Sequence, residues 1–105
     1  MNPSDDATLQ HFRTALRTAY GARLERVVLF GSRARGDAKA NSDYDVAVFL
    51  NEFEGFGVEA HRIAAIETDI LYDMGAVINA VPFKAGAYSG RTPLMAELRR
   101  DGLDL

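Results

Sequence analysis

The sequence contains no cysteine, no apolar run long enough to span a membrane and no excess of basic residues. The absence of cysteine excludes disulfide bonds and thiolate metal sites. The first ten residues show neither the basic nor the apolar segment of a signal peptide, and no apolar run approaches the roughly 20 residues of a membrane helix. We therefore expect a cytoplasmic protein without a membrane partner. The formal net charge of -3 argues against a broad nucleic-acid-binding face.

Hydrophobic residues make up 48% of the 105 residues, which is enough for one core and predicts a single domain, residues 1–105. Ser4 is the expected N-cap of a first helix that ends near Gly21. Apolar patterns predict strands at 26–30, 44–50 and 76–83, a short helical turn at 32–38 and helices at 58–74 and 93–101. Pro82 indicates that the third strand lies at an edge. The expected fold class is α/β (α+β): a small three-stranded mixed sheet with helices packed on it.

Two acidic residues, Asp43 and Asp45, stand at the start of the second predicted strand. Residues i and i+2 of a strand point to the same face, so the two carboxylates project together and repel each other. A divalent cation such as Mg²⁺ removes this repulsion and prefers carboxylate oxygens together with water and phosphate. A pair of this kind is also common at solvated strand ends and turns. The pair by itself therefore leaves both interpretations open.

The first predicted strand ends abruptly at Gly31-Ser32, and two arginines follow, Arg33 and Arg35. Gly31 permits a sharp bend and a close approach of a ligand to the backbone. Free N–H groups at the start of a helical turn, the Ser32 hydroxyl and the two guanidinium groups suit a phosphate. Separately, such a turn is ordinary and R-x-R-G is compatible with a surface patch. In combination with the two carboxylates, the segment predicts a site for a magnesium-bound nucleoside triphosphate.

At this point the sequence resembles a known family. Gly31-Ser32, the two arginines and the segment "SDYDVAV" are similar to the G-S-x(n)-D-x-D signature of the DNA polymerase β-like nucleotidyltransferase superfamily, and most of all to its minimal nucleotidyltransferases (MNT group). The resemblance implies the nucleotidyltransferase fold, a triphosphate held at Gly31 and Ser32, and Mg²⁺ bound by Asp43 and Asp45. It also implies a partner, because short members are often antitoxins that modify a helical HEPN-type ribonuclease toxin with AMP.

The sequence departs from the family pattern at Asn79. Active members usually carry a third carboxylate on the next strand, where this chain has "VINAVPF". Period-two alternation puts Asn79 on one face with Val77 and Val81, and we expect that face to turn toward Asp43 and Asp45. An asparagine can coordinate through its oxygen but cannot act as a base. Three acids on the preceding helix, Glu67, Asp69 and Asp73, are interpreted as solvated charges, with the two aspartates next in line should Asn79 not be the missing acid.

Two functional hypotheses follow. The first is an enzyme that transfers a nucleoside monophosphate, AMP from ATP in the first place, to a partner protein; Asp43, Asp45 and Asn79 would form its catalytic site, and Gly31, Ser32, Arg33 and Arg35 its nucleotide site. The second is a binding module that keeps the fold but has weak or no catalysis, which Asn79 favours. A homodimer is compatible with the short chain and the edge strand.

Overall fold

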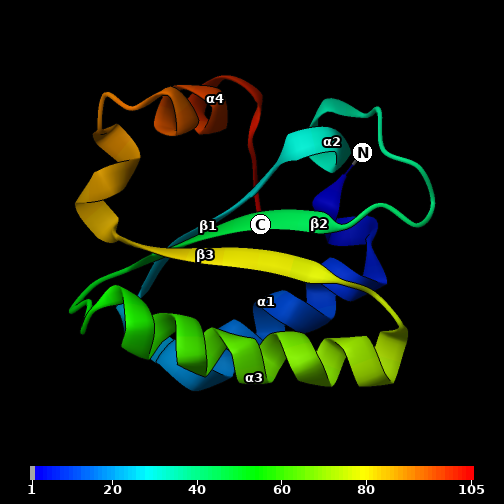
Figure 1. Cartoon of the computed structure of the whole chain (residues 1–105), viewed down its shortest axis with the longest axis horizontal. Coiled ribbons are helices and arrows are strands. Elements are labelled where there is room, and N and C mark those ends of the chain that lie inside the picture. Colours follow the sequence, from blue (N-terminus) through cyan, green and yellow to red (C-terminus); the bar gives the residue numbers. More distant parts are fainter. Residues whose placement is uncertain (1) are drawn as a thin grey trace.

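The computed structural model describes residues 2–105 and shows a four-stranded sheet with helices on both faces (Figure 1). The strands run in the order β3-β2-β1-β4; β2 and β3 are parallel, and the other neighbours are antiparallel. In chain order the elements are η1 (Pro3–Asp5), α1 (Ala7–Tyr20), η2 (Gly21–Arg23), β1 (Leu24–Phe30), α2 (Gly31–Arg35), β2 (Tyr44–Leu50), α3 (Phe56–Met74), β3 (Ile78–Lys84), η3 (Ala85–Ser89), α4 (Pro93–Asp101) and β4 (Leu103–Asp104).

The predicted fold class is confirmed, with one strand more than expected. The additional strand, β4, is only two residues long and pairs with Val28 and Leu29 of β1. Two residues are too few to show an alternating pattern, so the sequence carried no signal for it. Among residues 2–105, no helix has the length and the apolar character that crossing a membrane would need.

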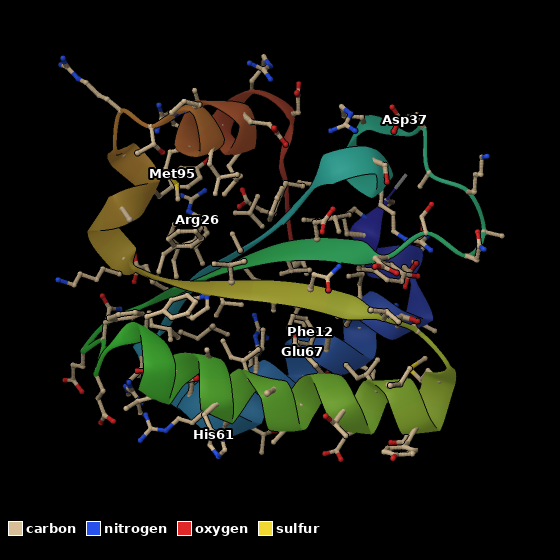
Figure 2. All side chains as sticks on the ribbon, in the orientation of Figure 1. Phe12, Arg26, Asp37, His61, Glu67 and Met95 are labelled. Carbon is tan, nitrogen blue, oxygen red and sulfur yellow. The ribbon has the colours of Figure 1, made fainter. Side chains whose placement is uncertain are left out.

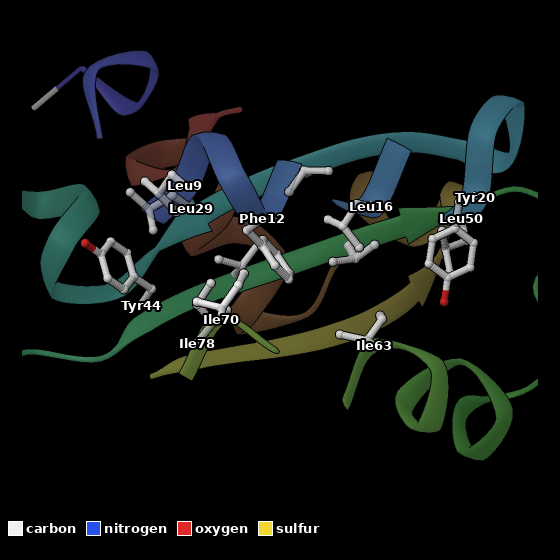
Figure 3. Packing of buried hydrophobic residues seen from close by; sticks show 13 residues of the cluster. Leu9, Phe12, Leu16, Tyr20, Leu29, Tyr44, Leu50, Ile63, Ile70 and Ile78 are labelled. Carbon is white, nitrogen blue, oxygen red and sulfur yellow. The ribbon is translucent and has the colours of Figure 1, made fainter. Parts of the chain in front are cut away.

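Helices α1 and α3 cover one face of the sheet. Phe12 and Leu16 from α1 meet Ile63 and Ile70 from α3 over the apolar side chains of β1 and β2 (Figure 3). The N-cap of α1 is Asp6, whose carboxylate accepts a hydrogen bond from the N–H of Leu9 at 3.0 Å. The prediction that Ser4 is the N-cap is therefore wrong, because Ser4 lies earlier in the chain, in η1. The sheet and these two helices form the larger part of the core.

The opposite face of the sheet is covered by η3 and α4, but only in part. Met95 and Leu98 of α4 pack on Val28, Ala47 and Phe49 (Met95 is labelled in Figure 2). Alternate residues of β2 share a face, so Asp45 lies on the same side as Ala47 and Phe49. It stands at the start of the strand, beyond the apolar cluster under α4. This arrangement leaves a polar corner at one end of the sheet.

The outer edge of β3 is closed by side chains rather than by another strand. The Glu67 carboxylate, which Figure 2 shows between α3 and the sheet, accepts a hydrogen bond from the N–H of Ala80 at 2.8 Å. Two residues further on, Pro82 has no N–H to offer. Burial raises the pKa of Glu67, and the hydrogen bond from Ala80 opposes this rise. The edge position predicted from Pro82 is confirmed, whereas the interpretation of Glu67 as a solvated charge is wrong.

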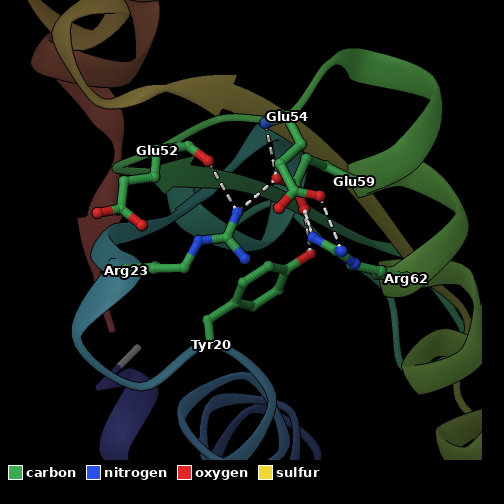
Figure 4. A network of polar contacts seen from close by, with 6 residues as sticks. All are labelled: Tyr20, Arg23, Glu52, Glu54, Glu59 and Arg62. Carbon is green, nitrogen blue, oxygen red and sulfur yellow. Dashed lines mark hydrogen bonds and ion pairs between the residues drawn. The ribbon is translucent and has the colours of Figure 1, made fainter.

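A second buried carboxylate, Glu59, lies at the far end of the sheet from Asp45. It is fully buried and accepts hydrogen bonds from Tyr20 at 3.0 Å, Arg23 at 2.7 Å, Arg62 at 3.3 Å and the N–H of Glu54 at 3.1 Å (Figure 4). Burial alone would raise the pKa of Glu59, but the donated hydrogen bonds and the positive charge of Arg23 outweigh it and lower that pKa. Glu59 is therefore ionised, and its hydrogen bonds hold the loop between β2 and α3 in place.

Candidate active site

Three of the predicted site residues meet at the polar corner of the sheet. Asp45 is paired with Phe30 of β1 on one side and with Asn79 of β3 on the other. The Asn79 amide donates a hydrogen bond from Nδ2 to Oδ2 of Asp43 at 3.2 Å. Asn79 therefore faces the same corner as the two aspartates, as period-two alternation predicted. Its neighbours Ile78 and Ala80 point to the other face and pack with α1 and α3.

Gly31 brings the backbone of the turn against Asp45. Its φ of +72° lies in the left-handed region, which glycine adopts without the strain of a side chain. A Cβ placed on Gly31 would lie 2.5 Å from Oδ2 of Asp45, closer than a real contact allows. The turn between β1 and α2 therefore favours glycine for its backbone angle, and a side chain at this position would also displace the Asp45 carboxylate.

Arg35 extends from the end of α2 toward α4 and keeps much of its guanidinium in solvent. Its side chain is 44% exposed and forms only long ion pairs, at 3.5 Å with Asp37 and 3.9 Å with Glu97. Pairs of this length between exposed groups stabilise the fold by little, about 0–1 kcal/mol. Arg35 can therefore turn toward an anion at the Gly31-Ser32 turn at small cost.

Arg33, which was predicted to contact phosphate, already makes several contacts within the protein. Its guanidinium donates to the carbonyl of Ser42 at 3.0 and 2.6 Å and to that of Ala40 at 3.3 Å, and it stacks 3.8 Å from the centroid of the Tyr44 ring. Tyr44 is in turn anchored by its hydroxyl, which donates to Asp6 at 2.9 Å. These contacts hold the loop that leads to Asp43. We therefore leave Arg33 out of the phosphate contacts proposed below.

The acids of α3 cannot complete the site. Glu67 is bound to the backbone of β3, and Asp69 and Asp73 are exposed on a helix that packs on the opposite face of the sheet. The suggestion that one of these aspartates is next in line as the third carboxylate is therefore wrong. The three residues at the polar corner itself are Asp43, Asp45 and Asn79.

The oxygen atoms of this corner suit a hard divalent cation. Within residues 2–105, neither Asp43 nor Asp45 forms an ion pair with Lys or Arg. Over the same residues, no three acidic, histidine or cysteine side chains come together as a metal cage. Mg²⁺ is commonly held in this way, by one or two carboxylates with water and substrate phosphates completing its shell. The residues present therefore fit a metal ion that arrives with a phosphate ligand.

Comparison with known proteins adds evidence that is independent of this geometry. A family model described as "Nucleotidyltransferase domain" matches residues 9–90, which include the turn, both aspartates and Asn79. The chain belongs to the nucleotidyltransferase family. Within it, a relative from Methanocaldococcus jannaschii, named "Putative protein adenylyltransferase MJ0604", is 31% identical over 78 residues, covering 74% of this chain and 72% of that protein.

Solved structures of nucleotidyltransferase-fold proteins show the same arrangement of helices and strands. One, a toxin–antitoxin crystal structure with AMP-PNP, gives a TM-score of 0.62 at 19% identity and covers 89% of this chain and 68% of that chain. Another, a mutant of the toxin-antitoxin MntA-HpeT, gives a TM-score of 0.62 at 16% identity over 99% of this chain and 72% of that chain. At these identities the likeness establishes the nucleotidyltransferase fold.

Proposed function

We propose that this nucleotidyltransferase transfers a nucleoside monophosphate, AMP from ATP in the first instance, to a hydroxyl group of a partner protein. The observation that carries the proposal is the meeting of Asp43, Asp45 and Asn79 beside the Gly31 turn. The adenylyltransferase name of the relative and the AMP-PNP in the similar toxin–antitoxin structure support the choice of ATP and of a protein acceptor.

Each residue would act on a different part of the nucleotide. The backbone at Gly31 and the hydroxyl of Ser32 would bind the triphosphate, and Arg35 would neutralise its outer phosphates. Asp43 and Asp45 would hold Mg²⁺, which supplies charge stabilisation at the reacting phosphate when bound. Together these groups orient the triphosphate so that its α-phosphorus faces the corner occupied by Asn79.

In the transfer step, the acceptor hydroxyl oxygen forms a bond to the α-phosphorus, and the bond from that phosphorus to the β-phosphate oxygen breaks. Pyrophosphate leaves with the electron pair of the broken bond, and the hydroxyl proton passes to solvent water. A carboxylate in place of Asn79 could receive this proton, but the amide of Asn79 cannot. The absence of a general base costs typically about 10²–10⁴-fold in rate. We therefore expect the chain to bind ATP well and to transfer AMP slowly.

The proposed acceptor is a helical HEPN-type toxin encoded beside this chain, which would make the chain an antitoxin. The two toxin–antitoxin structures with this fold support that role. A homodimer of the chain is compatible with it.

The test is incubation of the purified chain with α-labelled ATP, Mg²⁺ and the neighbouring gene product. Label on the partner, lost in Asp43→Asn and Asp45→Asn, is the expected result. Asn79→Asp should increase the label. Absence of label with every nucleoside triphosphate, together with no thermal shift at millimolar nucleotide, would contradict the proposal.

A second function, that of a binding module with little catalysis, is favoured by one contact. The amide of Asn79 already donates a hydrogen bond to Asp43, so the corner is stable without a third negative charge. In that case wild type would bind the partner and ATP, and Asn79→Asp would leave the label at background level.

A further inference from the structure

Exposed apolar side chains gather where α3 ends and β3 begins. Tyr72 is 83% exposed, and Leu71, Met74 and Val77 are each exposed by more than a third. We call these four residues the α3-end patch. The segment lies at the same end of the sheet as the loop that enters β2 (Figure 1). An apolar group of this kind beside a functional site marks an interaction surface more often than scattered single residues do.

Part of the α3-end patch borders the Asp43 side of the candidate active site. Met74 and Val77 line a pocket of about 260 Å³ together with Asp43. The backbone is also joined at this point, because the N–H of Tyr44 donates to the carbonyl of Val77 at 2.9 Å. A molecule seated on the patch therefore lies directly beside one of the two proposed metal ligands.

The charge around the patch selects the kind of molecule that can sit there. Between Arg62 and Lys84 the chain carries three acidic residues and no basic one. Arg33 lines the pocket shared with Met74 and Val77, but its guanidinium donates to backbone carbonyls of the loop before β2. Glu67 is committed to the edge of β3, whereas Asp69 and Asp73 are exposed beside the patch. This acidic rim repels nucleic acid and favours a surface with Lys or Arg around an apolar centre.

We propose that the α3-end patch is the docking surface for the acceptor protein, and that it receives an apolar segment flanked by Lys or Arg next to the hydroxyl that is modified. The proposal rests on the transferase function proposed above and adds the place and the chemistry of the acceptor. Docking at this patch brings the acceptor hydroxyl to the Asp43 side of the corner, where Asn79 also lies.

The other end of α3 offers a matched control. Phe56 is 61% exposed, comparable with the patch, and lies in the first turn of the same helix. Sixteen residues separate it from Tyr72 in the sequence, which corresponds to about 24 Å along a helix. A surface effect that depends only on an exposed aromatic ring would be equal at both positions.

The absence of cysteine allows an acceptor to be attached at one position only. Tyr72→Cys and Phe56→Cys each receive, through a disulfide bond, the same peptide: a six-residue Gly-Ser linker followed by a tyrosine between leucines. A linker of this length spans roughly 13 Å, less than the separation of the two sites. Each peptide is made with flanking lysines and with flanking glutamates, and transfer from α-labelled ATP is followed with Mg²⁺.

We expect labelling at position 72 to be at least about tenfold faster than at position 56, because the tether raises the local acceptor concentration only where it reaches the site. Lysine-flanked peptide should be labelled several-fold faster than glutamate-flanked peptide, and Asp69→Lys with Asp73→Lys should reverse this preference. Equal labelling at the two positions, or no effect of the flanking charge, overturns the docking surface while leaving the transferase intact.

Absence of label in all conjugates, with ATP binding retained, overturns the transferase proposal and the docking surface together. A second copy of the chain is the alternative occupant. Sedimentation would then show a dimer of the wild-type chain and a monomer of Tyr72→Ala, with the same fold by circular dichroism. That result would identify a second copy as the occupant and overturn the proposal.

Discussion

At the end of β2 that carries Leu50, the carboxylate of Glu59 is buried and receives four hydrogen-bond donors, two of them from arginines. At the other end, about 20 Å away by the length of the strand, Asp43 and Asp45 have one amide donor between them in the described hydrogen bonds and no ion pair. The first group is complete within the protein. The second has few partners within the protein and keeps its oxygens available for the proposed metal ion, and this difference separates a structural carboxylate from a candidate catalytic one.

Removing the charge of each carboxylate group in turn is the strongest test of this difference. Asp45→Asn should lower AMP transfer by about 100-fold or more, because metal-held charge stabilisation is worth several kcal/mol. Without metal, its free energy of unfolding should stay equal or rise slightly, since a like-charge pair is relieved. Labelled-ATP transfer and urea unfolding measure the two effects. Asp5→Asn, at an exposed position in η1, is the control, and equal loss of transfer in it would argue against a specific role.

The matching change at the other end is Glu59→Gln. It leaves Arg23 and Arg62 facing a neutral group, and breaking a buried ion pair costs about 3–5 kcal/mol. Urea unfolding should show this loss, while ATP affinity of the folded fraction stays close to wild type. The control is Glu54→Gln, because Glu54 pairs only at the surface, with Arg62 at 2.8 Å. A loss in Glu54→Gln as large as in Glu59→Gln would show that burial is not the cause.

Gly31→Ala tests whether the turn and Asp45 are fitted to each other. A left-handed φ costs a side chain about 1–3 kcal/mol, and the new Cβ would also displace the Asp45 carboxylate. We expect lower stability in urea and at least tenfold weaker ATP binding by calorimetry. Gly86→Ala serves as the control, since a Cβ there meets nothing within 4 Å. If ATP binding is unchanged in Gly31→Ala, the turn does not bind the nucleotide.

The smallest effect concerns the hydroxyl of Tyr20. Burial and the hydrogen bond to Glu59 raise the pKa of Tyr20 to about 12, above its unfolded value of 10.0. The neutral form therefore stabilises the fold fully below pH 10, and this contribution is lost as the pH rises toward 12. Tyr20→Phe should cost about 1 kcal/mol at pH 7. Urea titrations should show that the difference in free energy of unfolding between wild type and Tyr20→Phe is smaller above pH 10 than at pH 7. A constant difference would contradict the raised pKa.

The sequence predicted the polar corner because each part of it obeys a local rule. Period-two alternation placed Asp43 and Asp45 on one face and turned Asn79 toward them, and a glycine before a serine marked the bend. Such local rules could not predict the contacts of Arg33. Its guanidinium reaches Ser42, which lies nine residues away, and the ring of Tyr44, and only the folded path of the loop brings these groups together.

The buried network of Glu59 had no signal in the sequence either. Glu59 stands in an amphipathic helix like any surface glutamate, and its partners Tyr20 and Arg23 are 39 and 36 residues away. Likewise, Glu67 could not be separated from its exposed neighbour Asp69 by spacing alone. Burial of a charged group depends on which other chain segments arrive to pair with it, and that information is not local.

The closed edge of β3 has a consequence for how the protein behaves when it is concentrated. Residues two apart on a strand point their backbone groups the same way, so Ala80 and Pro82 both face outward. The N–H of Ala80 is occupied by Glu67, and Pro82 has no N–H. An incoming strand from another molecule finds no run of free donors to template its pairing. The sheet is thus protected against growing into fibrils along this edge, and self-association is directed to some other surface.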